Sequence, residues 1–282
     1  MILDLLRHRE LLFTLVKRDL KVRYKASSLG FLWSFGRPLF LMLIMWGVFS
    51  VIVRVKSVVI PYELHLLTGI LPWMFFQGAI FEAQASVVAN SNVVKKVSLP
   101  TETFPAASVL SNLVHLMLAF CILFFFIVIY ALFKDPLLAP GWEVIFLPAI
   151  VLLQTALLLG IALTLSSLYV FYRDIGSISE IALTAWFYLT PVIYPLQDAR
   201  HALKSLSGES DLLYYLYLCN PMTPVIAGYR RVLFGQVLRN APEVSDKTLL
   251  LGLAVSTLWA IALLALGTYL FNRLSKRFAD EL

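Results

Sequence analysis

Long runs of apolar residues, separated by short polar segments, dominate the sequence. A helix needs about 20 mostly apolar residues to cross a bilayer. Six stretches meet that length, with boundaries near 29–53, 64–88, 105–133, 144–170, 175–194 and 249–271. The pattern therefore predicts an all-α polytopic membrane protein with six transmembrane helices, forming a single transmembrane domain over residues 1–282.

The segment 4–24 has a different period. Its apolar residues recur at helical spacing on one broad face, whereas Glu10, Thr14, Lys17, Arg18 and Lys21 share the opposite face. This pattern is typical of an amphipathic helix that lies in the membrane interface. An ordinary soluble amphipathic helix has the same pattern, but the adjacent apolar stretch favours the interface.

The segment 196–247 contains two shorter apolar pieces, 211–218 and 224–234. Pieces of about ten residues are too short to span, so they are expected to be re-entrant or interfacial helices. Together they would cap the outer side of the protein.

The charge distribution sets the orientation. Only 14% of the residues are charged and 60% are hydrophobic, whereas a soluble domain has about a quarter charged. Lys and Arg gather before the first stretch, after the second, after the fourth and after the sixth, which places both termini on the cytoplasmic side. The net charge of +6 forms no basic stripe with interleaved aromatics, so no nucleic-acid partner is expected.

Catalytic and cofactor motifs are missing from the sequence. It contains no G-x-x-x-x-G-K-S/T phosphate loop, no H-E-x-x-H, no Cys/His cluster and no G-x-S-x-G. We therefore expect no catalytic residue, no metal and no cofactor in this chain. Glu82 and His115 fall within predicted spans, but a lone histidine there is more often a helix–helix hydrogen-bond partner than a proton relay. A proton-coupled carrier is thus weakly disfavoured.

Four local motifs carry a resemblance to a known family. They are Arg18–Trp33 (RDLKVRYKASSLGFLW), Phe171–Gly176 (FYRDIG), Leu189–Pro195 (LTPVIYP), and Asn220–Pro224 (NPMTP) followed by Gly228–Arg231 (GYRR). In this order they resemble the ABC permeases that export O-antigen, capsule-type glycans or teichoic acids. The resemblance implies a multi-pass homodimer in the bacterial cytoplasmic (inner) membrane. It also implies two copies of a separate ATPase subunit that bind ATP and Mg and drive export of a lipid-linked glycan.

The resemblance also implies where the ATPase docks. The cytoplasmic segment 89–100 would be the coupling helix, since Asn and Ser can cap a helix and Pro100 ends the element. Arg173 and Asp174 would form a second, smaller contact. A plain connecting loop and a solvated topology marker are the respective alternatives. The expected coupling residues are Asn90, Ser91, Asn92, Val93, Val94, Lys95, Lys96, Arg173 and Asp174.

Candidate substrate contacts follow from the chemistry of a lipid-linked glycan. Aromatic rings can stack on sugar faces, and the resemblance places spans one and five along the pathway, which suggests Trp33, Phe40, Trp186, Phe187, Tyr188 and Tyr194. Cations at headgroup level could attract a diphosphate: Lys21, Arg23, Lys25 and Arg37. The outer gate candidates are Tyr214, Tyr215, Tyr217, Tyr229 and Arg230. Membrane-interface belts and anchors to anionic lipid are the alternatives.

Two other functions remain open at this stage. The same architecture could export a drug or a small lipid. A membrane-embedded lipid-glycan enzyme is the third possibility, but it would need carboxylates or histidines clustered on one face. Glu63, Glu82 and His65 do not obviously supply such a site.

Overall fold

The computed structural model describes residues 8–24, 33–52, 60–96, 99–206, 208, 210–239 and 243–282. This part of the chain is built from helices and contains no strand. The elements are α2 (Arg9–Tyr24), α3 (Trp33–Trp46), the π-helix η2 (Gly47–Ile52), α4 (Tyr62–Ala89), α5 (Ser91–Lys96), α6 (Thr103–Phe133), α7 (Leu147–Phe171), α8 (Ile175–Tyr188), α9 (Leu196–Leu206), α10 (Leu212–Leu218), α11 (Met222–Leu233), α12 (Gly235–Leu238), α13 (Asp246–Leu274) and α14 (Phe278–Glu281).

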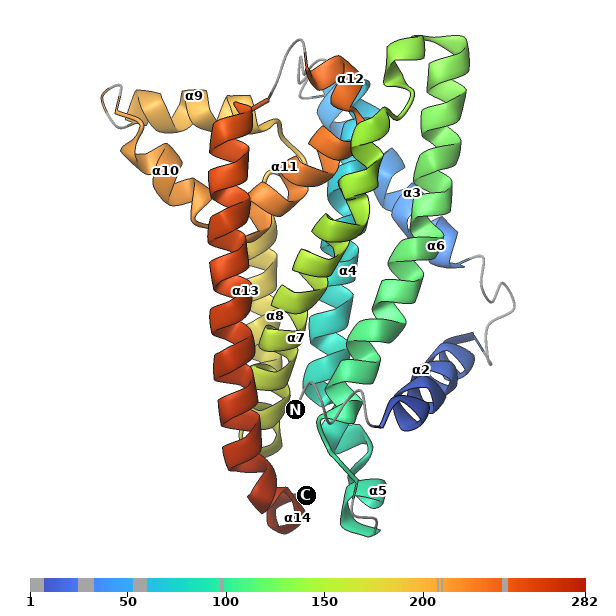
Figure 1. Ribbon diagram of the computed structural model, residues 1–282, viewed down its shortest axis with the longest axis vertical. Helices are drawn as coiled ribbons and strands as arrows, with labels where there is room; N and C mark the ends of the chain where they lie inside the picture. The colour runs from blue at the N-terminus through green and yellow to red at the C-terminus, as the bar shows by residue number, and fades with distance from the viewer. Residues whose placement is uncertain are drawn as a thin grey trace.

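The long helices α4, α6, α7 and α13 run along the long axis of the molecule (Figure 1). Helices α5 and α14 lie at one end, here called the α5 end, and α9 to α12 lie at the other, the α11 end. Four described helical segments are long and apolar enough to cross a bilayer: Tyr62–Lys96, Thr103–Phe133, Pro136–Phe171 and Asp246–Arg277.

The first and fifth predicted spans are shorter as helices. Helix α3 with η2 ends at Ile52, and the beginning of the first predicted span lies outside the described residues. Helix α8 stops at Tyr188, and 189–195 form turns instead of the helix predicted to Tyr194. Pro191 explains the early stop, since proline lacks an N–H and clashes with the preceding helical turn.

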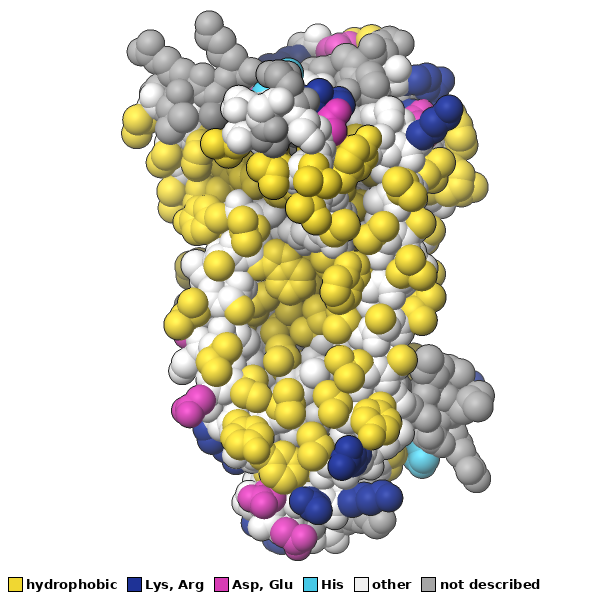
Figure 2. Space-filling view, turned by 90° about the vertical axis from the view of Figure 1, so that its left-hand side faces the viewer, with side chains coloured by type: hydrophobic (Ala, Val, Ile, Leu, Met, Phe, Trp, Pro, Cys, Tyr) yellow, Lys and Arg dark blue, Asp and Glu magenta, His cyan; other side chains and the backbone are white. Residues whose placement is uncertain are grey.

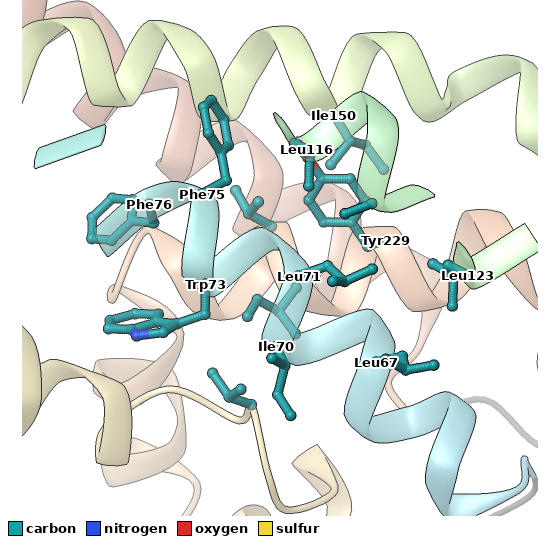
Figure 3. Packing of buried hydrophobic residues seen from close by; sticks show 14 of the residues in the cluster. Leu67, Ile70, Leu71, Trp73, Phe75, Phe76, Leu116, Leu123, Ile150 and Tyr229 are labelled. Carbon is teal, nitrogen blue, oxygen red and sulfur yellow. The ribbon is translucent and has the colours of Figure 1, made fainter. Parts of the chain in front are cut away.

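Helix α4 is the centre of the bundle. Its most apolar window is 78% buried inside the protein, against 28%, 39% and 22% for the other three long segments. Figure 3 shows α4 side chains such as Phe76 and Leu67 packed among residues of α6, α7 and α11. A helix that is apolar all round needs cover on every side, and the surrounding helices provide it.

Hydrophobic side chains form a belt across the middle of the face seen in Figure 2. Charged side chains gather toward the two ends of the molecule in this view. Exposed apolar side chains of the long helices include Leu152 of α7 and Leu250, Leu258 and Ile261 of α13. Soluble proteins rarely expose apolar area on this scale. The belt therefore fits immersion in lipid.

Helices α7 and α13 approach closely through two glycines. A methyl group on Gly160 would lie 2.5 Å from the backbone of Leu263, and one on Gly267 would lie 2.5 Å from the carbonyl oxygen of Gly160. Small residues of this kind allow helix backbones to meet in a membrane.

Candidate functional site

The predicted coupling segment forms a short exposed helix at the α5 end. Within α5, Asn92, Lys95 and Lys96 are exposed, and Ser91, Val93 and Val94 are half-buried. Asn90 ends α4, and its side-chain amide donates to the Ser86 carbonyl at 2.7 Å. The element thus presents cations and amides to solvent and keeps its valines against the bundle.

Helix α2 is attached to this segment. The Arg18 guanidinium donates to the Asn90 side-chain oxygen at 2.7 Å. Nearby, Leu15 and Val16 are buried against Phe104 and Ala107 of α6, with Val93 and Val94 packed on the same cluster. The amphipathic helix and the end of α4 are therefore linked by both a polar and an apolar contact.

The turn between α7 and α8 lies at the same end (Figure 1). Arg173 and Asp174 are exposed there. The Arg173 guanidinium lies over the Tyr169 ring, 5.3 Å from its centre. This stacking fixes the cation close to the helix end without covering it.

Helix α3 has an open face with aromatic character. Trp33, Arg37, Phe40 and Ile44 recur at helical spacing, so they lie on one side of the helix. Trp33 is 50% exposed and Phe40 is 62% exposed. Lys25, predicted to act with Arg37, lies outside the described residues.

Helix α8 contacts the bundle through a narrow stripe. Only Ser179 and Leu183 are buried, and the Ser179 hydroxyl donates to Gln84 of α4 at 2.6 Å. On the open side, a polar line runs along the helix at i, i+3, i+7 and i+11: Ser177, Glu180, Thr184 and Tyr188, all exposed. A carboxylate facing hydrocarbon is costly, so this line is suited to a wet environment.

The predicted aromatic residues of α8 divide into two groups. Tyr188 is exposed. Trp186 and Phe187 are half-buried and pack on α4, with the Trp186 ring 5.1 Å from Phe76 and the Phe187 ring 5.5 Å from Trp73. Part of the predicted aromatic set thus attaches α8 to the centre of the bundle.

Polar side chains hold the α11 end of α8. Asn220 accepts from the Trp186 indole at 2.8 Å and donates to the Leu189 carbonyl and the Thr190 hydroxyl, each at 3.0 Å. The Tyr194 hydroxyl lies 3.0 Å from that of Tyr217. These contacts satisfy backbone groups that the broken helix leaves without partners.

A closed cluster of charged and polar side chains lies at the α11 end of the bundle. Its members are Arg230 of α11, His65 of α4, and Glu243 in the segment before α13. The side chains of Arg230 and His65 are 0% exposed, and that of Glu243 is 5% exposed. Arg230 and His65 each approach the Glu243 carboxylate to 3.6 Å, and Arg230 donates to the Val192 carbonyl at 3.1 Å. The cluster joins three distant parts of the chain.

Tyr229 and Arg230, proposed from sequence as gate residues, are fully buried. The Tyr229 hydroxyl donates to Gln154 of α7 at 2.8 Å, and the Gln154 amide donates to the Pro72 carbonyl of α4 at 2.8 Å. Both residues thus connect α11 to the bundle rather than line a surface.

The cap at the α11 end is formed by α9 and α10. Tyr214 is buried, Tyr217 is half-buried and Tyr215 is exposed. Arg200 lies over the Tyr214 ring at 5.2 Å and pairs with Asp211 at 3.4 Å. Hydrogen bonding from Arg200 lowers the pKa of Asp211 below its ordinary value, and Asp211 in turn raises the pKa of Arg200.

A cavity of about 350 Å³ lies among α2, α3, α4 and α6. Four polar residues that line it are here called the open cluster: Arg23, Arg37, Glu82 and Asn112. Arg23 forms an ion pair with Glu82, and the Asn112 amide donates to the same carboxylate at 2.6 Å. Lys21, on α2 beside Arg23, is exposed.

Sequence reasoning flagged Glu82 as an acidic residue in an apolar stretch but gave it no role. It missed Asn112 and Glu243. Asn112 gives a weak signal, since it is an amide within the third span. Glu243 lies in a polar loop and has no signal of its own, because its partners are far away in sequence.

Comparison with known proteins identifies the relatives of the chain. It is 29% identical to the O-antigen export system permease protein RfbA of Myxococcus xanthus over 279 residues, covering 99% of this chain and 98% of that protein. A Klebsiella pneumoniae RfbA is 28% identical and covers 97% of this chain and 95% of its own length. The polysialic acid transport protein KpsM of Escherichia coli is 25% identical over 99 residues, 35% of this chain.

The profile of one transporter family covers most of the bundle. The ABC-2 type transporter family matches residues 10–234, from α2 to the end of α11. The match includes α5, the helices α3 and α8, and the residues that line the cavity. The chain therefore belongs to the ABC-2 type transporter family of membrane proteins.

Proposed function

We propose that this chain is the transmembrane subunit of an ATP-driven exporter that moves a lipid-linked polysaccharide across the bacterial inner membrane. The observation that carries the proposal is the end-to-end similarity to O-antigen export permeases. In this proposal the chain has six spans: α3 with η2, α4, α6, α7, α8 and α13. The α5 end and both termini face the cytoplasm.

The pathway lies between two copies of the chain and is bordered by α3 and α8. The polar line on α8 supports this, because Glu180 needs water or a partner and the rest of the chain leaves it exposed. Trp33, Phe40 and Tyr188 are exposed rings on the same two helices. They would offer flat surfaces to passing sugars.

ATP and Mg bind to a separate ATPase subunit, two copies of which serve the homodimer. That subunit docks on α5 and on the Arg173–Asp174 turn. The exposed Lys95 and Lys96 suit an acidic groove on the partner. The Arg18–Asn90 hydrogen bond would transmit movement of the docked segment to α2.

Lys21, Arg23, Lys25 and Arg37 draw the diphosphate of the lipid carrier toward the cytoplasmic side of the pathway. At the far side, Tyr214, Tyr215 and Tyr217 with α9 and α10 close the exit at rest. Tyr229 and Arg230 hold this gate on the bundle, which their full burial supports.

The test is co-purification with a candidate ATPase chain from the same genome. The Lys95→Glu/Lys96→Glu variant should lose co-elution and the ATP hydrolysis stimulated by the permease, because it reverses the charge of the docking surface. Lys134→Glu is the matched control, since Lys134 is exposed at the opposite end of α6. This control should co-elute normally.

Three outcomes would each contradict part of the proposal. A permease that never associates with the ATPase, although both fold, would point to a carrier or a membrane enzyme. Equal co-elution of the double variant and the control would remove α5 from the docking surface. If the assembled complex exported a drug or a small lipid and moved no glycan, the proposed substrate would be wrong.

A further inference from the structure

The cavity among α2, α3, α4 and α6 has a polar end and an apolar end. Glu82 and Asn112 lie at the side nearer α5, whereas Leu71 of α4 and Ala119 of α6 lie further along the same antiparallel helices. The distance from Glu82 to Leu71 along α4 is roughly 16 Å at 1.5 Å per residue. An elongated cavity with this gradient matches an amphipathic molecule.

The charges of the side chains that line the cavity do not balance. Arg23 and Arg37 supply two positive charges and Glu82 supplies one negative charge. The Glu82 carboxylate is held by Arg23 and by the Asn112 amide. Among the described residues, Arg37 has no hydrogen bond or ion pair, although it lines the cavity. An anion is the group that would complete the site.

The walls suit a hydrocarbon chain. Pro38, Met74, Phe75 and Leu116 are apolar residues that line the cavity. Its volume of about 350 Å³ falls in the range of small-molecule sites. A free inorganic anion would leave this apolar surface uncovered, so the ligand should carry both a phosphate and a lipid tail.

The Arg23–Glu82 ion pair blocks part of the anion site. Arginine binds phosphate through the same planar fork that it offers to a carboxylate. A phosphate that reaches Arg23 must therefore displace Glu82. Both side chains retain substantial exposure, 33% and 40%, so this exchange requires no unfolding of the bundle.

We propose that this cavity binds the phosphate group of an amphipathic lipid between Arg37 and Arg23, and that Glu82 is a built-in competitor for Arg23. The ligand is a prenyl diphosphate of the substrate class or a resident anionic phospholipid. The first source rests on the proposed function, whereas phosphate-lipid binding itself does not.

Binding can be measured on the purified full chain in dodecylmaltoside micelles. Trp33 lines the cavity, so its fluorescence reports occupancy, and Trp33→Phe identifies its share of the signal. The probes are geranylgeranyl diphosphate, dioleoylphosphatidylglycerol, inorganic diphosphate and the uncharged geranylgeraniol. We expect saturable binding of the first two and much weaker binding of the last two.

Two variants should change the affinity for the phosphate-containing lipid in opposite directions. Arg37→Gln should weaken binding roughly tenfold, since one charge-assisted contact is lost. Glu82→Gln should tighten binding severalfold by freeing Arg23. Glu82→Asp keeps the competitor and should bind like wild type, which separates competition from a general loss of structure. Arg173→Gln removes a cation outside the cavity and serves as the control.

The proposal is overturned if Glu82→Gln binds no tighter than Glu82→Asp, or if Arg37→Gln and Arg173→Gln bind equally. Equal affinity for geranylgeraniol would also overturn it, because the phosphate would then be irrelevant. Preference for the prenyl diphosphate supports substrate as the source, and preference for the phospholipid supports a resident lipid. No ATPase is present, so failure of the proposed function leaves this result intact.

Discussion

Two arginine–glutamate pairs occupy the same apolar bundle under very different conditions. In the closed cluster, Arg230, Glu243 and His65 are almost wholly buried. In the open cluster, Arg23 and Glu82 keep about a third or more of their side-chain surface exposed beside a cavity, and Arg37 adds a further cation. The residue types are alike, so burial and the balance of charge decide what each cluster can do.

The closed cluster holds structure together. Its side chains come from α4, α11 and the segment before α13, and the Arg230 and Glu243 charges would each be unfavourable alone in a low-dielectric surrounding. The open cluster can exchange partners because water still reaches it. Solvent access to the charged side chains therefore separates the structural cluster from the cluster that can bind a ligand.

The largest expected effect comes from breaking the closed cluster. Arg230→Met leaves the Glu243 carboxylate buried with no full counter-charge, which should cost about 3–5 kcal/mol of folding free energy. Unfolding in mixed dodecylmaltoside–SDS micelles measures the loss. The double variant Arg230→Met/Glu243→Gln should recover part of it, and a single variant as stable as wild type would remove the cluster from the scaffold.

Asn220→Ala should have the next largest effect. It leaves the Trp186 indole and the Leu189 carbonyl without their partner at the end of α8. The loss should be about 1–3 kcal/mol, measured in the same micelles. Asn272→Ala on α13, an exposed amide at the other end, provides the control. Similar losses for both variants would mean that the α11 end of α8 is not specially held.

Arg23→Met should destabilise far less than Arg230→Met, although both remove an arginine paired with glutamate. Glu82 remains accessible to water and keeps its Asn112 hydrogen bond, so the cost should stay below about 1 kcal/mol. This variant is compared directly with Arg230→Met in one unfolding series. A loss as large as that of Arg230→Met would erase the distinction between the clusters.

The smallest effect concerns the solvent-accessible pair Arg200–Asp211 on the cap formed by α9 and α10. Because the pKa of Asp211 is lowered in the folded protein, its stabilising contribution is present above its unfolded pKa, near 4, and is lost as pH falls through the folded value. The melting-temperature difference between wild type and Asp211→Asn should be small at pH 7 and should shrink further as the pH is lowered below about 4. A difference that does not change with pH would contradict this assignment.

Apolar patterning predicted the long helices because the thickness of the hydrocarbon core sets how many consecutive apolar residues a spanning helix needs. It also pointed to the two short apolar pieces that form α10 and α11, whereas α9 and α12 were not predicted. The helix α5 was expected from the family resemblance rather than from apolar patterning. The end of α8 was predicted too far along, since 189–195 is apolar enough for a span but carries two prolines. Hydropathy does not register the missing N–H of Pro191 that stops the helix.

The two clusters were less accessible from sequence. Arg23 and Arg37 were singled out as cations at headgroup level, but their relation to Glu82 depends on how α2 and α3 pack against α4. His65, Arg230 and Glu243 are brought together only by the folding of distant segments. Arg230 was therefore expected at a surface, and its burial became visible only in three dimensions.

The glycine contact between α7 and α13 also has a consequence for biosynthesis. During translation, α13 is the last of the long helices to leave the ribosome, so α7 must wait in the membrane with its Gly160 groove uncovered. Shape complementarity rather than hydrophobicity selects α13 to fill that groove, because lipid tails are as apolar as leucine. The assembly of the bundle is therefore completed only after synthesis of this region ends, and a ribosome that stalls before residue 246 would release a chain with an open seam.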